Sequence, residues 1–351
     1  MLVEVTEVSH GTYTPTLSAV GSVRAEKEIM LSSRVAGEII AVADGFSPGG
    51  FVEQGEVLLR IDPADYDAAL TQRLSELHQA QADFELELGR QELARGDYEE
   101  LKGSISPQYE TLVLRRPQLN AARARVEAAE AAVKRAELDL ERTRIRAPFA
   151  AQVLTREVNL GSQVSPAETL GQLVGTDQYW VEVALPAADV SWIRFPDAQQ
   201  SEGSVTRVRN RTAWPEGVYR TGFAKSLIGA LDSQTRLARV LVAVTDPLSQ
   251  LSESAGQPPL MVGSFVEANI EGRPIENVIR LEQDYLRRND TVWVNGNGQL
   301  EIRDVDVLFR DKTFAYIRSG LAEGEQVVMT DLATVIAGAA LRLDRSDNSD
   351  E

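Results

Sequence analysis

The chain carries one short pattern twice, on either side of a long helical stretch. Each copy spaces a glycine, a valine, a small residue and a leucine three positions apart, as Gly49, Val52, Gly55 and Leu58 and again as Gly161, Val164, Ala167 and Leu170. Glycine permits turns with positive φ, so each copy predicts a strand, a tight turn and a second strand. This repeat constrains the fold more than any other feature of the sequence.

An upstream echo extends the repeat. Val35-x-Gly37-x-Ile39 in the first half corresponds to Phe149-x-Ala151-x-Val153 in the second. Neither half holds enough apolar residues to close a core alone, so we expect the two to pair about a pseudo-twofold axis. Val52 and Val164 should then lie in one body. The alternative is that the copies are two unrelated strand-turn pairs of a β-rich chain.

Residues 63–146, between the halves, have helical periodicity. Apolar residues recur mostly at steps of three, four or seven positions in two arms: Leu70, Leu74, Leu77, Phe84, Leu88 and Tyr98, then Leu112, Leu119, Ala122, Val126, Ala129, Val133, Ala136 and Leu140. A seam this narrow is typical of a coiled coil. We expect an antiparallel hairpin that starts with Asp62 as N-cap and has a loose tip from Gly103 to Pro117. Pro117 should mark the true start of the return helix.

The remainder of the chain is typical of β-structure. Alternating segments with glycine and proline turns fill residues 178–273, with one short helix expected at 187–193. Near the C-terminus, an Asn-Gly turn between alternating runs predicts a β-hairpin from Val292 to Ile302. Asp304 and Asp306 flank Val305, which indicates an exposed strand face rather than a metal or acid–base pair.

Composition excludes several function classes. Lys+Arg 36 against Asp+Glu 53 gives a formal net charge of −17, which disfavours nucleic acid as a partner. Cys 0 and His 2 leave no thiolate zinc site or histidine cage, and no nucleophile elbow or phosphate loop is present. We therefore expect no enzyme, no metal and no cofactor. No apolar run is long enough to span a bilayer, and no signal peptide opens the chain.

Two further motifs carry a family resemblance. Leu140 to Phe149, which ends in Ala147-Pro148-Phe149, resembles the "L-x-x-T-x-I-x-A-P-F" junction of periplasmic adaptors, also called membrane fusion proteins (haemolysin-D-like). Ser319 to Val328 is similar to their "S-G-L-x-x-G-E-x-V-V" stretch. The closest subgroup serves RND-type multidrug efflux pumps. Ala151 departs from the pattern, because the family usually has glycine there.

The resemblance implies a mainly β chain with a long α-helical hairpin, arranged as an elongated multi-module adaptor. Its expected parts are a membrane-proximal domain (1–20 and 275–345), a β-barrel (21–32 and 177–274), a split lipoyl-like domain (33–62 and 147–176), the hairpin (63–146) and a disordered tail (346–351).

The resemblance also implies a function. Such adaptors lie in the periplasm, attached to the inner membrane through an N-terminal anchor that we expect to be missing from this chain. They join an inner-membrane RND transporter to an outer-membrane TolC-type channel, assemble as hexamers and export drugs or other small toxic compounds. Matching the family's tip pattern of Arg, Leu and Ser gives the channel-binding candidates Arg95, Leu101, Ser104, Ile105 and Ser106.

Three alternatives stay open at this point. The chain could serve an ABC-type exporter or a metal-efflux pump, although scarce His and Met argue against metal. It could be a lipoyl or biotinyl carrier, although the hairpin occupies the place of the short turn that would hold the modified lysine, and Lys102 near the tip is a poor substitute. It could also be an unrelated coiled-coil scaffold.

Overall fold

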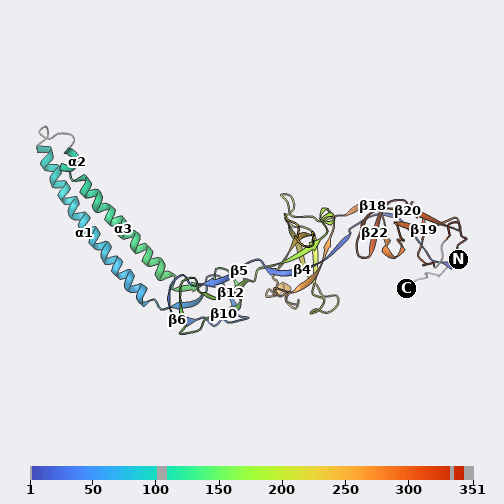
Figure 1. The fold of residues 1–351 in the computed structure, drawn as a ribbon, viewed down its shortest axis with the longest axis horizontal. Coiled ribbons are helices and arrows are strands. Elements are labelled where there is room, and N and C mark those ends of the chain that lie inside the picture. The colour runs from blue at the N-terminus through green and yellow to red at the C-terminus, as the bar shows by residue number, and fades with distance from the viewer. Residues whose placement is uncertain (1, 101–108, 333–335, 344–351) are drawn as a thin grey trace. The chain divides into compact units, whose positions relative to one another are not determined.

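A computed structural model describes residues 2–100, 109–332 and 336–343. The chain divides into two compact units, Lys27–Gly175 and the combination of Met1–Glu26 with Thr176–Glu351. Both are rich in strands, and the first also carries the long helices (Figure 1). The predicted fold class, mainly β with a long α-helical hairpin, is confirmed.

The unit Lys27–Gly175 contains a β-domain made of two four-stranded sheets. One sheet has the order β5-β12-β10-β7 and the other β11-β6-β8-β9. The strands are β5 (Glu28–Ser32), β6 (Gly37–Val42), β7 (Phe51–Val52), β8 (Val57–Ile61), β9 (Arg144–Arg146), β10 (Ala151–Arg156), β11 (Gln163–Val164) and β12 (Thr169–Gly175). Each sheet therefore includes strands from both sides of the helical insertion.

The two halves exchange their shortest strands. β7, from the first half, pairs with β10 through Val52 opposite Ala151. β11, from the second half, pairs with β6 through Val164 opposite Gly37. The exchange follows the predicted pseudo-twofold relation, and it leaves neither half with a complete sheet of its own.

A single hydrophobic core lies between the sheets. Val52, Leu58, Val164 and Leu170 are all buried in it, so the two halves form one body as predicted. Ala147 belongs to the same core, Phe149 packs against its edge and Pro148 is exposed. Ala151 is a buried strand residue and not part of a turn, which explains why glycine is dispensable there.

The glycines of the repeat occupy turns. Gly49, Gly55 and Gly161 have φ angles of 85°, 82° and 81°. Ala167, which stands where the first copy has Gly55, adopts the same left-handed conformation with φ 69°. An L-residue in that region is strained, because its Cβ approaches the backbone. The second copy therefore keeps the turn of the first without the residue best suited to it.

The hairpin consists of α1 (Ala64–Glu100), the short α2 (Glu110–Val113) and α3 (Arg116–Glu141). Figure 1 shows α1 and α3 running side by side from a common base on the β-domain. Asp62 accepts a hydrogen bond from the backbone N–H of Ala64 at 3.0 Å, as expected of a helix cap. Pro117 lies in the first turn of α3, where its missing N–H costs nothing.

The predicted seam is right for α3 and partly wrong for α1. From Leu119 to Leu140 every predicted seam residue is buried or half-buried, but Leu112 is exposed. On α1, Leu74 and Leu88 are 37% and 39% exposed. After Leu77, the next inward-facing residue of α1 is three positions along, at Ala80, and not four. From there the seam continues through Glu87 and Ala94. Leu74, three residues before Leu77, and Leu88, four residues after Phe84, therefore face solvent.

The other unit contains a closed barrel with the strand order β13-β16-β15-β14-β17-β4. Its strands are β4 (Thr16–Ala25), β13 (Gln178–Leu185), β14 (Val205–Arg209), β15 (Arg220–Ile228), β16 (Ala238–Thr245) and β17 (Phe265–Glu271). β13 alternates strictly, with every second side chain buried inside the barrel. At two places the strands depart from the predicted boundaries: β4 starts before residue 21, and β5 pairs in the split β-domain rather than the barrel.

Two four-stranded sheets and a two-stranded ladder complete this unit. The sheets have the orders β21-β22-β18-β3 and β2-β23-β19-β20, and β1 pairs with β24. The strands are β1 (Leu2–Val3), β2 (Val5–Glu7), β3 (His10–Tyr13), β18 (Ile275–Glu282), β19 (Thr291–Gly296), β20 (Gln299–Asp304), β21 (Asp306–Arg310), β22 (Phe314–Ser319), β23 (Gln326–Val328) and β24 (Arg342–Leu343). Three 3₁₀ turns are η2 (Ala187–Trp192), η3 (Ser252–Ser254) and η4 (Gln283–Tyr285). The β19–β20 hairpin and η2 match the hairpin and short helix predicted from the sequence.

The turn at Ala167 yields a stability test. Ala167→Gly removes the left-handed strain and should raise the free energy of unfolding by about 1 kcal/mol. Gly55→Ala should lower it by a similar amount, because a Cβ there meets no atom within 4 Å and only the backbone is strained. Urea denaturation measures both. Ala68→Gly, on an exposed face of α1, is the control for glycine itself and should destabilise the hairpin. Stabilisation by Ala68→Gly, or none by Ala167→Gly, would contradict the interpretation.

Candidate functional site on the helical hairpin

Of the five predicted channel-binding residues, the structure describes Arg95. Leu101, Ser104, Ile105 and Ser106 lie outside the described residues. Arg95 lies on the last turns of α1, and its side chain is 75% exposed. Its Nε is 3.7 Å from the Glu99 carboxylate, an exposed pair that contributes little to stability. The guanidinium of Arg95 is therefore available to a partner.

An ion pair between a buried carboxylate and a partly exposed guanidinium lies between the two arms. Glu87 occupies a seam position of α1 and is only 7% exposed. Arg115 donates from Nε to Glu87 Oε1 at 2.7 Å and from Nη2 to Oε2 at 3.0 Å. Arg90 adds a weaker contact at 3.5 Å. The hydrogen bond from Arg115 holds the pKa of the Glu87 carboxyl below its ordinary value, and the nearby charges of both arginines act in the same direction.

Arg115 is also the residue at which the return arm breaks. It has φ 51°, a left-handed conformation between the end of α2 and the start of α3. Its backbone N–H donates to the carbonyl of Leu112. One side chain thus ties this break to α1 and sets the register of the arms next to the tip. The sequence analysis did not predict this pair. The available signal was that Glu87 lies three residues after Phe84 and four before Gln91, which is the spacing of the seam.

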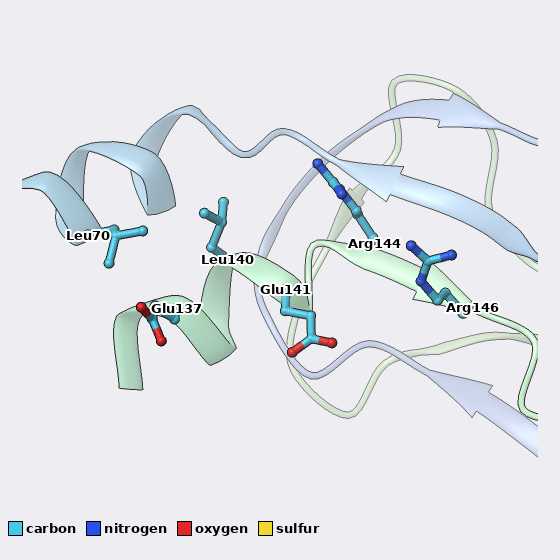
Figure 2. A pocket seen from close by; sticks show the side chains of 6 residues that line it. All are labelled: Leu70, Glu137, Leu140, Glu141, Arg144 and Arg146. Carbon is cyan, nitrogen blue, oxygen red and sulfur yellow. The ribbon is translucent and has the colours of Figure 1, made fainter. Parts of the chain in front are cut away.

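The base of the hairpin forms a small groove of about 300 Å³. Figure 2 shows its lining, contributed by the start of α1, the end of α3 and β9: Leu70, Glu137, Leu140, Glu141, Arg144 and Arg146. Arg146 donates to the carbonyl of Gly55 at 2.8 Å, which ties the strand after the hairpin to the turn before it. The lining thus combines two carboxylates, two guanidinium groups and two leucines where the hairpin joins the β-domain.

Metal ligands are not assembled in the part of the chain that the structure describes. No group of three or more His, Asp or Glu side chains there could hold an ion. Within the described residues, no helix is long and apolar enough to cross a bilayer.

Comparison with known proteins decides the family. Residues 27–176, which span the split β-domain and the hairpin, match the family described as RND MFP, barrel-sandwich hybrid domain. Residues 27–176 belong to the membrane fusion proteins, the periplasmic adaptors of efflux pumps. The family consists of adaptors and not of enzymes, in agreement with the prediction that the chain is non-enzymatic.

Curated relatives of the adaptor match over nearly its whole length. Multidrug resistance protein MdtA of Klebsiella pneumoniae is 26% identical over 334 residues, which cover 93% of this chain and 76% of that protein. Its Escherichia coli counterpart gives the same identity and coverage. The alignment therefore extends beyond the split β-domain to the barrel and the last sheets.

Solved structures share the adaptor's fold. MacA from Actinobacillus actinomycetemcomitans superposes with a TM-score of 0.60 at 18% identity, covering 93% of this chain and 99% of that one. A putative efflux transporter from Bacteroides eggerthii gives a TM-score of 0.54 at 17% identity, covering 99% and 92%.

The Glu87–Arg115 pair predicts a pH-dependent stability of the hairpin. Because the pKa of Glu87 is lowered on folding, its contribution is complete above the ordinary value of 4.5 and is lost as the pH falls through the lowered value. Glu87→Gln should lower the melting temperature of the helical signal at pH 7, and the deficit should shrink below pH 4.5. Circular dichroism at 222 nm measures it.

The matched control is Glu85→Gln, which changes an exposed carboxylate two residues away. It should leave the melting curve unchanged at both pH values. A Glu87→Gln deficit that is equal at pH 7 and at pH 3 would show that the charge of Glu87 contributes nothing.

Proposed function

We propose that the chain links an inner-membrane RND transporter to an outer-membrane TolC-type channel and supports export of drugs or other small toxic compounds. The RND family match and relatives named as multidrug resistance proteins support this assignment. On this proposal the adaptor lies in the periplasm, held at the inner membrane.

The observation that carries the proposal is the combination of split β-domain and hairpin. The arms of the hairpin bury their narrow seam against each other, so α1 and α3 need no further core. On the last turns of α1, the guanidinium of Arg95 is exposed and can meet a partner. A mechanical role follows: the hairpin reaches the channel, and the β-domains hold the transporter.

We propose four modules with the boundaries expected from the sequence, apart from the two strands noted above. The barrel and the membrane-proximal sheets contact the transporter, and the hairpin contacts the channel. Because one chain cannot enclose a conduit, the adaptor works as a ring of copies, for which six is the number that the family resemblance implies.

Excision of the hairpin tests the proposal. Ile61 donates from its backbone N–H to the carbonyl of Thr143 at 2.8 Å, so the ends of the insertion are adjacent. A variant that lacks residues 64–141, with Pro63 joined to Arg142 by a short Gly-Ser linker, should keep both sheets of the split β-domain. It should nevertheless fail to restore drug resistance to a strain that lacks the adaptor gene.

Far-ultraviolet circular dichroism and a cooperative thermal transition check that the excised variant folds. The full-length chain is the positive control. If the folded variant without a hairpin restores resistance, the conduit role is wrong. A variant that does not fold is replaced by full-length chains with altered charge, as follows.

Arg95→Asp tests the tip in the full-length adaptor. If the tip docks on a channel, reversal of this exposed charge should lower resistance and weaken cross-linking to the channel without changing the melting curve. Arg135→Asp makes the same change on an exposed face of α3 near the base and serves as the matched control. Equal resistance with both variants would remove Arg95 from the proposed contact.

A further inference from the structure

A groove of about 530 Å³ lies on the outer face of the barrel, next to the sheet that contains β18 and β22. Three barrel strands contribute outward side chains to it: Arg207 and Arg209 from β14, Glu267, Asn269 and Glu271 from β17, and Thr16 and Ser18 from β4. The neighbouring sheet and its β21–β22 turn add Arg280, Asp311, Lys312, Thr313, Phe314 and Tyr316, and Thr14 and Arg211 complete the lining. All of these residues belong to one compact unit.

Positive charge gathers in this groove although the chain is acidic. Four arginines and one lysine face three carboxylates, an excess of two positive charges in a chain with a formal net charge of −17. Cations concentrated in a concave site strengthen the local field and attract anions. The groove is therefore a local exception to the charge of the whole molecule.

The three carboxylates are already engaged. Glu267 holds Arg211 through two contacts, at 2.5 and 2.7 Å, and lies 3.9 Å from Lys312. Asp311 accepts hydrogen bonds from the Tyr316 hydroxyl at 2.6 Å and from the backbone of its own turn. Glu271 lies 3.9 Å from Arg207. In the described part of the chain, none of the three carboxylates forms an ion pair with Arg209 or Arg280.

Arg209 lacks an acceptor. Arg209 lies opposite Glu267 in the strand ladder, but the Glu267 carboxylate is hydrogen-bonded to Arg211. Among the described residues it has no hydrogen bond or ion pair from its side chain, and its Nε is buried with no partner. A buried guanidinium nitrogen without an acceptor is costly, and a ligand that supplies the acceptor removes that cost.

Arg280 is fixed in place but also lacks a carboxylate. Its guanidinium carbon lies 4.6 Å from the ring centroid of Tyr13 and 4.4 Å from that of Phe314. Cation–π contacts with both rings hold the guanidinium in position without using its N–H groups, which can still donate. In the described part of the chain, no ion pair occupies them.

We propose that this groove binds a phosphate monoester, with Arg209 and Arg280 as its principal donors. A doubly charged phosphate offsets the excess of two positive charges and accepts bonds from two guanidinium groups at once. Hydroxyl groups of Thr16 and Thr313 line the same groove and can donate to the remaining oxygens, whereas the Ser18 hydroxyl already donates to Asn269 at 2.6 Å. Its volume suits a small molecule or a single lipid headgroup. This binding goes beyond the proposed linking of transporter and channel.

Isothermal titration calorimetry on the full chain at low ionic strength tests the proposal, with glycerol phosphate as the soluble probe. Sedimentation with vesicles that contain phosphatidic acid tests the headgroup, and phosphatidylcholine vesicles are the blank. Arg209→Gln and Arg280→Gln should each weaken binding at least about tenfold, because each removes a charge-assisted contact. Arg288→Gln, an exposed arginine of the same unit outside the groove, should leave binding unchanged.

Binding of glycerol phosphate alone identifies a soluble phosphate ester as the ligand, and binding only of phosphatidic acid vesicles identifies a lipid headgroup. Either result supports the site if both groove variants lose it. Absence of binding to both probes, or binding that Arg209→Gln and Arg280→Gln leave intact, overturns the proposal. Thermal melting of each variant shows that the fold is preserved. None of these outcomes depends on export or on a channel.

Discussion

Reciprocal backbone hydrogen bonds between the two halves of the split β-domain hold this part of the chain together. Gly49 donates to Val153 at 2.8 Å, and Gly161 donates to Ile39 at the same distance. Further along, Gly55 donates to Ala147, and Ala167 donates to Ser33, both at 2.8 Å. Each half supplies acceptors that the other requires, so buried backbone groups are satisfied only when both are present.

This reciprocity explains how a long hairpin can interrupt a small domain. The entropy of closing a loop grows slowly with its length, and here the inserted chain is itself folded. The ends of the insertion meet at β8 and β9, which pair through Leu59 and Ile145. The insertion therefore disturbs no sheet bond. The hairpin can differ in length or in its tip while the β-domain stays the same.

At one position of the hairpin seam, an ion pair takes the place of a hydrophobic contact and fixes the alignment of the two arms. Small residues such as Ala122 and Ala129 let the helices approach, and Glu87 stands where a coiled coil would place an apolar residue. A buried carboxylate needs its cation, so any shift of register that separates Glu87 from Arg115 is penalised. The pair accordingly acts on alignment of the arms, next to the segment that we propose meets the channel.

Much of this architecture could be predicted from the sequence, because the repeat and the heptad are patterns of local spacing. The common core of Val52 and Val164, the start of α3 at Pro117 and the β19–β20 turn were predicted in this way. The exposure of Leu74 and Leu88 was not predicted. The inward-facing residue nearest to Leu77 can lie three or four positions away, and only packing against the partner helix decides which. The groove that contains Arg209 could not be predicted from the sequence either, since its lining residues are distant along the chain.

A disulfide across the β7–β10 ladder gives the most direct test of the account. The chain has no cysteine, so Phe51→Cys with Gln152→Cys introduces the only pair, at positions directly opposite in the ladder. Opposed strand residues lie within disulfide reach. If the halves complete each other, mild oxidation should form an intramolecular bond that shifts mobility on a non-reducing gel and raises the melting temperature. Free thiols in the folded protein after oxidation would contradict it.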